Sequence, residues 1–280
     1  MVWNMENKVK QCFMKFLAKF CLNKPQEEIL EDIQERIFVD DGNSWLNAEK
    51  IYITDQIYIR IPTVGEVLKN EQSYYGLIYA LTSSPFQYMV QLDDMGLDYT
   101  KVTDYQLFQI MFTVLSNTNM SIIFGDLITK GYELYIDNTN DTDILYNESL
   151  GLDYKIDEFV YIKIADVLRK INNIKKDNSK PGNEEAKRYL LKKARKRQRR
   201  NANKPYEPYL EKMVVALVNR PEFKYNYEQV MDMSIYKFNQ SFKQIETSIT
   251  FDKTMIGVYA GTVDTSKMAD KSSLSWIPIK

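Results

Sequence analysis

The sequence predicts an α+β fold that is predominantly helical, with small β-hairpin elements near residues 50–61 and 132–146 and a helical C-terminal part. Three observations support this prediction. Most apolar residues recur every three or four positions, which is the spacing of an amphipathic helix. Two short stretches change to a period of two, which is typical of strands. Two threonines are each followed three positions later by Glu or Gln, a pattern that marks the start of a helix.

The N-terminal segment is predicted to form two helices. The first has apolar residues at helical spacing, namely Val9, Cys12, Phe13, Phe16, Leu17, Phe20 and Cys21. The second begins near Pro25, because proline suits the first turn of a helix. Cys12 and Cys21 lie about 13 Å apart along a helix axis, so they cannot pair within that helix. We expect both to be buried thiols in a reducing cytoplasm.

Two stretches are predicted to form strands, and the first of them has two possible interpretations. In residues 51–61, isoleucines occupy alternate positions, which fits either one long strand or a hairpin that turns at residues 55–56. Residues 132–136 and 144–146 are predicted as two short strands about a polar loop.

Several helices are predicted from their end signals. The two capping boxes are Thr63 with Glu66 and Thr103 with Gln106. Ser84–Pro85 is expected to open another helix, which Gly96 ends in a left-handed conformation. A further helix is predicted over 157–172 from its apolar spacing.

The C-terminal part is predicted to be helical and to end in a docking tail. Apolar residues in 210–218 and 235–249 predict two helices, the second ending near Ile249. The glycine-containing stretch 257–264 is expected to form an ordered turn. The polar stretch after it changes abruptly to Trp276 and Ile277, which we expect to be anchored either on the protein's own core or in a partner's groove. The hypothesis is that residues 264–280 form a docking tail that binds a partner through Trp276 and Ile277.

Charge divides the chain and predicts its domains. Residues 1–160 hold 12 Lys and Arg against 25 Asp and Glu, whereas residues 161–280 hold 25 against 13. We therefore expect an acidic α+β domain over 1–172, a basic linker and helical arm over 173–204, and a helical C-terminal domain over 205–280.

Several function classes are excluded or disfavoured by composition. The chain contains no histidine, which excludes Ser-His-Asp and Cys-His catalysis and His-ligated metals. It also has no phosphate-binding glycine motif and no CxxC pair. We therefore expect neither an enzyme nor a cofactor. The start of the chain does not have the pattern of a signal peptide, and no apolar run approaches the roughly 18 residues of a membrane span, so no membrane partner is expected.

A basic run is the main candidate binding segment. Residues 187–200 contain nine cations in fourteen positions. Such a run fits a solvated or protein-contacting arm, whose partner is the acidic half of this chain or an acidic neighbour. It also fits the neutralisation of nucleic-acid phosphates, although it lacks the interleaved aromatics that stack on bases. The residues expected to bind a partner here are Lys192, Lys193, Arg195, Arg197, Arg199 and Arg200.

Two acidic clusters each have a functional and a structural interpretation. From Asp137 to Glu148 the oxygen-bearing residues follow calcium-loop spacing, but Thr142 stands where the loop requires glycine, so a hairpin loop is favoured. The second cluster comprises Asp93, Asp94, Asp98 and Asp104. It could hold magnesium or transfer protons, but its position at helix ends favours a structural role.

Parts of the sequence resemble a known family. The resembling segments are residues 59–68, 74–75, 81–85, 92–99, 103–108, 218–225, 232–238, 257–264 and 275–277. They are similar to uncharacterised tail-region proteins (tail assembly chaperones and baseplate-associated proteins) of phages and prophages of low-GC Gram-positive bacteria. The resemblance covers about half of the chain and carries no catalytic motif.

The resemblance implies a role in building a phage tail or baseplate, as an assembly chaperone or as a minor tail component. The implied partners are the tape measure, tail tube or baseplate subunits, with self-association into a homo-oligomer as a further option. The implied location is the host cytoplasm during phage assembly, or the tail of the virion. The alternative from the residues themselves is a nucleic-acid-binding phage protein that uses 187–200.

Overall fold

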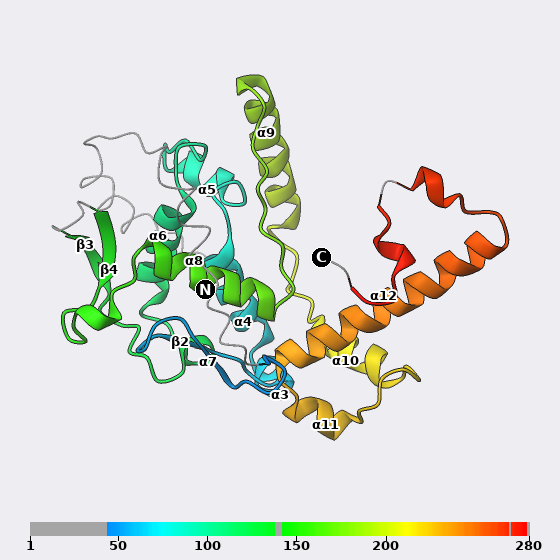
Figure 1. Cartoon of the computed structure of the whole chain (residues 1–280). Coiled ribbons are helices and arrows are strands. Elements are labelled where there is room, and N and C mark those ends of the chain that lie inside the picture. Colours follow the sequence, from blue (N-terminus) through cyan, green and yellow to red (C-terminus); the bar gives the residue numbers. More distant parts are fainter. Residues whose placement is uncertain (1–43, 138–141, 269, 279–280) are drawn as a thin grey trace. The chain divides into compact units, whose positions relative to one another are not determined.

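The computed structural model describes residues 44–137, 142–268 and 270–278 (Figure 1). The predicted N-terminal helices and both cysteines fall in residues 1–43 and lie outside the described residues. The chain separates into two compact units. The first contains the described residues up to Ile61, Gln72–Lys170 and Ile174–Glu207, and the second contains Pro62–Glu71, Ile171–Asn173 and the chain from Pro208 onward.

The predicted fold class is confirmed, because helices predominate and the strands form two small antiparallel sheets. β1 (Lys50–Tyr52) pairs with β2 (Tyr58–Arg60), so the hairpin interpretation of 51–61 is correct. β3 (Glu133–Asp137) pairs with β4 (Thr142–Tyr146), as the strand pattern predicts.

Helices make up most of the first unit. They are α4 (Glu71–Thr82), α5 (Met89–Asp94), α6 (Asp104–Leu115), α7 (Ser121–Phe124), the short 3₁₀ helix η2 (Leu152–Tyr154), α8 (Glu158–Ile171) and α9 (Glu184–Asn201). α4 begins and α8 ends at a residue that belongs to the second unit. The helix predicted to begin at the Thr103 capping box and the helix predicted over 157–172 are thus present, and α9 is the predicted basic helix.

Aromatic side chains from α6, α7 and α8 form the centre of this unit. The ring of Phe112 lies 5.6 Å from that of Phe124 and 5.3 Å from that of Tyr132, both edge-on. Phe108 lies 4.6 Å from Tyr161. These separations suit the offset and edge-to-face contacts that aromatic quadrupoles prefer. The hydroxyl of Tyr105 donates to the Ile156 carbonyl at 2.7 Å, so a buried polar group is satisfied.

Both predicted capping boxes are present. The Thr103 hydroxyl accepts from the Gln106 N–H at 3.1 Å, and the Gln106 side chain accepts from the Thr103 N–H at 2.9 Å. Thr63 and Glu66 make the same two bonds at 3.2 Å and 2.9 Å. Each box satisfies two backbone N–H groups that the first helical turn leaves without partners.

The prediction for the helix opening at Ser84–Pro85 is partly wrong. Residues 85–88 form turns and α5 begins at Met89. The Gln87 side chain accepts from the Ser84 N–H at 2.9 Å, which stabilises this turn locally. The expected end is correct, since Gly96 has φ 77°.

The second unit is helical. It contains α3 (Val64–Lys69), α10 (Leu210–Val218), α11 (Tyr227–Asp232), α12 (Ile235–Tyr259) and the short 3₁₀ helices η3 (Thr265–Lys267) and η4 (Ser272–Leu274). Backbone bonds join its segments: the Val64 N–H donates to Met233 and the Ile235 N–H to Pro62, both at 2.8 Å. The buried Glu71 carboxylate accepts from the N–H groups of Tyr209 and Leu210 at 2.7 and 3.1 Å.

The predicted end of the last long helix is wrong. α12 continues past Ile249 to Tyr259, and Gly257 lies inside it. A glycine within a helix costs only about 1 kcal/mol relative to alanine, too little to end a helix whose apolar spacing continues. The left-handed residue is instead Gly261, with φ 70°. The domain boundaries expected near residues 172 and 204 remain a prediction.

Candidate interaction surfaces

The basic helix α9 has favourable ends despite its charge. The Asn183 side chain caps it by accepting from the Ala186 N–H at 2.7 Å. Glu184 and Glu185 occupy the first turn, and Arg199 and Arg200 occupy the last. Acids at the N-terminus and cations at the C-terminus interact favourably with the helix dipole, which offsets part of the repulsion among the cations.

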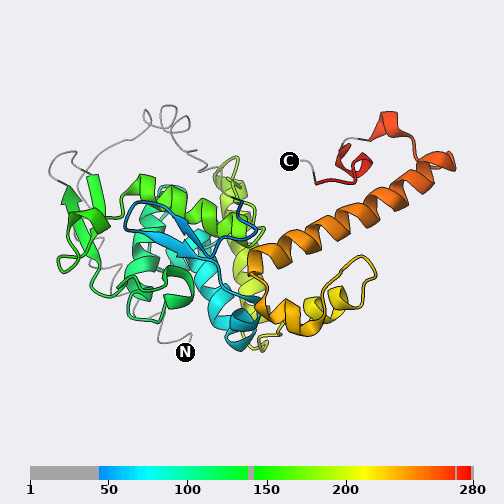
Figure 2. The ribbon, with the colours of Figure 1, turned by 60° about the horizontal axis from the view of Figure 1, so that its bottom comes forward.

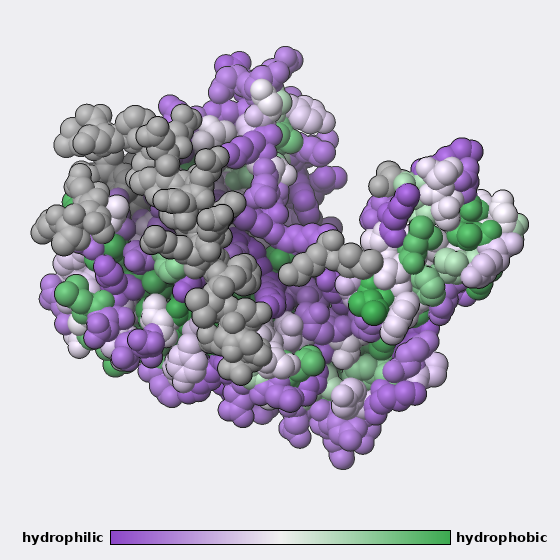
Figure 3. Space-filling model, in the orientation of Figure 1, coloured by the Kyte–Doolittle hydropathy of each residue, from purple (hydrophilic) through white to green (hydrophobic). Residues whose placement is uncertain are grey.

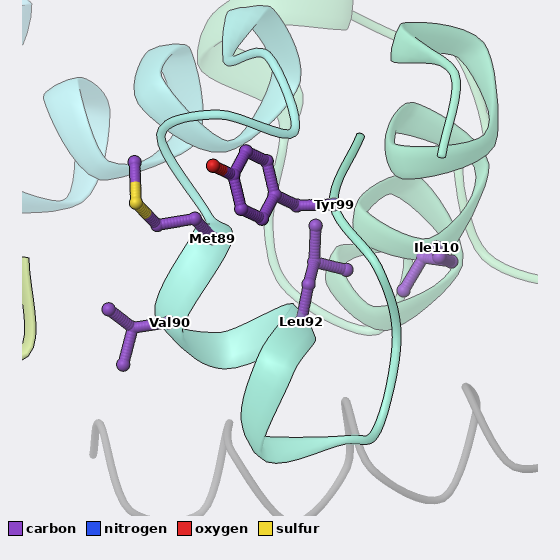
Figure 4. Close-up of a cluster of buried hydrophobic side chains, with 5 residues drawn as sticks. All are labelled: Met89, Val90, Leu92, Tyr99 and Ile110. Carbon is purple, nitrogen blue, oxygen red and sulfur yellow. The ribbon is translucent and has the colours of Figure 1, made fainter. Parts of the chain in front are cut away.

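One face of α9 packs against α5. Its half-buried Leu190, Leu191 and Ala194 contact a buried cluster of five residues, which are Met89, Val90, Leu92, Tyr99 and Ile110 (Figure 4). In Figure 4 the first three cluster residues project from α5, while Tyr99 and Ile110 come from the chain that follows. The helix is therefore part of the packed first unit.

Ion pairs reinforce this docking. The Arg195 guanidinium donates to both Asp93 and Asp94, the latter at 2.7 Å. The Lys187 ammonium lies 2.7 Å from the Asp98 carboxylate. Three acids of the predicted acidic cluster thus pair with the basic run, as expected if the run contacts the acidic half of the chain.

The fourth acid of this cluster, Asp104, pairs with Lys176 at 2.7 Å. The structural interpretation of the cluster is therefore favoured, because every one of its carboxylates has a cationic partner.

The pairing changes the protonation of Asp98. Burial alone would raise its pKa, but hydrogen bonds from Lys187 and Thr100 outweigh burial and lower the pKa to about 2. The Asp98 carboxylate in turn raises the pKa of Lys187. Both groups are therefore charged throughout the neutral range, which keeps the contact intact.

The opposite face of α9 is a continuous cationic surface, which we call the basic face. Its cations are exposed, and they are Arg188, Lys192, Lys193, Lys196, Arg199 and Arg200. At 100° per residue they lie about 60° or more around the helix from Leu190, Leu191 and Ala194, whereas the exposed Arg197 lies only about 20° from Leu190. Four of the six residues predicted to bind a partner in this run are on this face, while Arg195 is turned towards Asp93 and Asp94 and Arg197 lies beside Leu190. Tyr189 stands among these cations with 65% of its surface exposed.

A second surface lies on α12 and the chain after it. None of the described residues from 240 to 278 is buried. This segment nevertheless contains many apolar side chains, among them Phe242, Ile245, Ile249, Phe251, Met255, Ile256, Val258 and Tyr259. Hydrophobic side chains gather at the surface of this part of the chain (Figure 3). Apolar side chains left this accessible make the segment a candidate interaction site.

The predicted docking tail folds back along α12. After Gly261 the chain reverses and η4 packs against the helix (Figure 2). The Gln244 side-chain amide donates to the Trp276 carbonyl at 2.7 Å. The backbone is thus held, while the side chains of Trp276 and Ile277 remain 59% and 51% exposed.

The calcium-loop pattern has other partners where it is described. Its flanks are the paired strands β3 and β4, and not the helices that such a loop connects. Asp137 pairs with Lys155 at 3.3 Å, and the Tyr135 hydroxyl donates to Glu148 at 2.8 Å. Residues 138–141 lie outside the described residues.

Metal-binding and membrane-spanning features are both absent from the described part of the chain. It contains no group of three or more Cys, Asp or Glu side chains placed to hold a metal ion. None of its helices is both long enough and apolar enough to cross a membrane.

Two features of these surfaces are not predicted from the sequence. Tyr189 is an aromatic within residues 187–200, so the expectation that this run lacks interleaved aromatics is wrong. Its position one turn before Lys192 and Lys193 is the signal that places it on the same face. α12 is longer than the prediction that ends it at Ile249, and the signal for its length is the apolar spacing that Ile256 and Tyr259 continue.

Residues 199–279 match the family model of the YomV second domain, a phage-type domain named for YomV of a Bacillus prophage. This segment of the chain is similar to a phage-type domain. The match runs from the last turn of α9 through α10, α11 and α12 and includes the returning tail. No curated protein and no solved structure matches the chain.

Proposed function

We propose that this protein acts in bacteriophage tail morphogenesis by binding other proteins, as a tail or baseplate assembly chaperone or as a minor tail component. The observation that carries the proposal is the exposed apolar pair Trp276 and Ile277 on the tail that returns along α12, which lies within the segment similar to a phage-type domain. The resemblance of other segments to tail-region proteins supports the assignment to the tail.

The physical basis is the exposure of apolar side chains. An assembly protein must cover apolar surface on a subunit before that subunit polymerises, and a groove or helix face lined with apolar residues provides that contact. The half-exposed Trp276 is suited to such a role, because tryptophan is frequently a dominant contributor at interfaces. The expected partners are the tape measure, tail tube or baseplate subunits, met in the host cytoplasm during assembly or in the virion tail.

Binding, and not catalysis, is the proposed activity. Burial, followed by the charges of Asp104 and Asp157, raises the pKa of Glu158, as a catalytic acid would require. However, Asp157 caps α8 by accepting from the Val160 N–H at 2.8 Å, and Asp104 pairs with Lys176. The neighbours of Glu158 therefore have structural partners.

The proposal is tested by binding to separately expressed tape measure, tail tube and baseplate proteins of the same phage. Trp276→Ser and Ile277→Ser should weaken retention of one of these proteins in a pull-down. Leu152→Ser is the matched control, because Leu152 is an exposed apolar residue of the first unit. Unchanged retention in the tail variants, or equal loss in the control, would contradict this use of the tail.

A second candidate function is nucleic-acid binding by the basic face. The observation in its favour is the set of exposed cations around Tyr189, since cations neutralise phosphates and a tyrosine can stack on a base. Fluorescence anisotropy with a single-stranded oligonucleotide over a salt series tests it. The double variant Arg199→Gln, Arg200→Gln should reduce the steepness of the plot of log K against log salt concentration. The slope should change by about 1.4, which is roughly 0.7 for each of the two lost phosphate contacts.

A further inference from the structure

The apolar surface of α12 has a regular repeat. From residue 242 to 259 one stripe alternates in steps of three and four, through Phe242, Ile245, Ile249, Asp252, Ile256 and Tyr259. This is the a/d pattern of a coiled coil, in which each apolar residue inserts between residues of a facing helix. The two preceding members of the stripe, Ile235 and Phe238, are buried within the second unit itself. The stripe therefore emerges from the core of this unit onto its surface.

The stripe is accessible along its C-terminal half. Ile256 and Tyr259 are 62% and 82% exposed, whereas Phe242, Ile245 and Ile249 are half-buried. The returning tail is bonded to Gln244, which lies about 100° around the helix from Ile245. The stripe spans about 27 Å at 1.5 Å per residue, long enough for six layers of contacts with a second helix.

The residues that flank the stripe identify its partner. On one side, in the e positions, stand the exposed Glu246 and Lys253, and on the other side stand Ser241, Ser248 and Met255. In a parallel pair, the e positions of one helix face the g positions of the other. Because the g positions hold uncharged residues, neither Glu246 nor Lys253 would then meet an opposite charge. A parallel pair would also place Asp252 opposite its own copy, at a cost from like-charge repulsion.

An antiparallel pair resolves both conflicts. We propose that α12 pairs with α12 of a second copy of this chain in an antiparallel coiled coil, with Ile249 opposite Asp252. In this register Glu246 lies opposite Lys253 of the second copy, and two-fold symmetry repeats the pair with the copies exchanged. Phe242 lies opposite Tyr259, so the largest side chains close both ends of the interface.

Registers displaced by one heptad are disfavoured by the same charges. A displacement in one direction places Glu246 opposite Glu246, and in the other direction it places Lys253 opposite Lys253. The proposed register is thus selected by charge as well as by the apolar stripe. Asp252 in a central layer lowers the affinity, because its carboxylate is partly desolvated against Ile249.

A charge-swap cycle on the full-length protein tests the proposal. Analytical ultracentrifugation over a concentration series should show a monomer–dimer equilibrium. Glu246→Lys alone, and Lys253→Glu alone, each replace two attractions with two repulsions and should raise the dimer Kd by roughly tenfold. The double variant carrying both changes should restore the wild-type Kd, because the pairs are re-formed with their signs exchanged.

Two further variants distinguish this interface from a non-specific association of apolar surfaces. Asp252→Leu should lower the Kd, because it completes the apolar stripe, whereas Thr250→Lys, on the exposed polar side of α12, should leave it unchanged. Circular dichroism should show that each variant keeps its helix content. A monomer at all concentrations, or a double variant as weak as the single ones, would overturn the antiparallel pair. A monomer that binds a tail subunit through the same stripe would also overturn it, because the occupant would then be a different protein.

Discussion

The docking of α9 onto α5 makes a quantitative prediction, because its two faces have opposite environments. Leu190→Ala and Leu191→Ala remove side chains that contact the buried cluster around Leu92 and Tyr99. Lys192→Ala and Lys193→Ala remove exposed side chains from the basic face of the same helix. All four changes introduce alanine, so each change in helix propensity is small and favours the helix.

The expected magnitudes follow from burial. A fully buried leucine costs about 2–5 kcal/mol when changed to alanine, so the half-buried Leu190 and Leu191 should cost roughly 1–2 kcal/mol each. Arg195→Gln should cost about 0–1 kcal/mol, because Arg195, Asp93 and Asp94 are all more than a third exposed. The lysine changes should stay within about 0.5 kcal/mol, as surface substitutions usually do.

Amide hydrogen exchange is the appropriate assay, because two compact units need not unfold together and one global transition would average them. Protection of α5 and α9 amides should fall in the leucine variants and stay unchanged in the lysine variants, while protection of α10 amides serves as an internal control. Equal protection of the α9 amides in all four variants would refute the docking, and residues 187–200 would then be interpreted as a solvated arm.

Three further predictions concern other parts of the chain. Thr103→Ala should lower thermal stability by about 1 kcal/mol, and Thr103→Ser should recover most of it, because only the capping hydroxyl is at issue. Since the pKa of Asp98 is lowered from 3.8 to about 2, its contribution to stability is complete above pH 3.8 and is lost as the pH falls towards 2. Asp98→Asn should therefore reduce the loss of unfolding free energy between pH 3.8 and about 2. An unchanged loss in this pH range would contradict the pairing with Lys187. Gly261→Ala should destabilise the turn after α12 by about 1 kcal/mol in chemical denaturation because its φ is 70°, whereas Gly76→Ala, in a helix with open space around it, should stabilise.

Local signals predicted much of the fold from the sequence. A capping box is a reciprocal contact between residues three apart, so Thr103 and Gln106 specify it without help from distant segments. The alternation of isoleucines likewise specifies strands, although it left the hairpin and the single strand equally open. The hairpin forms because the Ile53 N–H donates to the Ile57 carbonyl at 2.8 Å across the turn.

Features that depend on competition between weak signals were less predictable. Ser84 and Pro85 resemble a helix start, but the chain makes a turn before α5 begins at Met89. Gly257 resembles a helix end, but its cost is smaller than the benefit of continuing α12 to Tyr259. In both cases the prediction relied on one residue more than on the apolar spacing of the residues around it.

The candidate surfaces were predicted in composition but not in geometry. The pairs of Arg195 with Asp93 and Asp94 join residues about a hundred positions apart, and no local rule could have specified them. The opposite charges of the two halves of the chain indicated only that such pairs should form.

The geometry of α9 also limits what the charge division can explain. If the basic run served only to neutralise the acidic part of the chain, its cations would turn towards Asp93, Asp94 and Asp98. Lys187 and Arg195 do so, but the cations of the basic face lie on the opposite side of the helix, where holding them together costs repulsion. Internal pairing accounts for the position of α9 but not for the exposed charge of the basic face, of which only Arg199 and Arg200 interact favourably with the helix dipole. We propose that this remaining charge contacts an acidic partner, and the oligonucleotide-binding measurement on the Arg199 and Arg200 variant tests whether that partner is a nucleic acid.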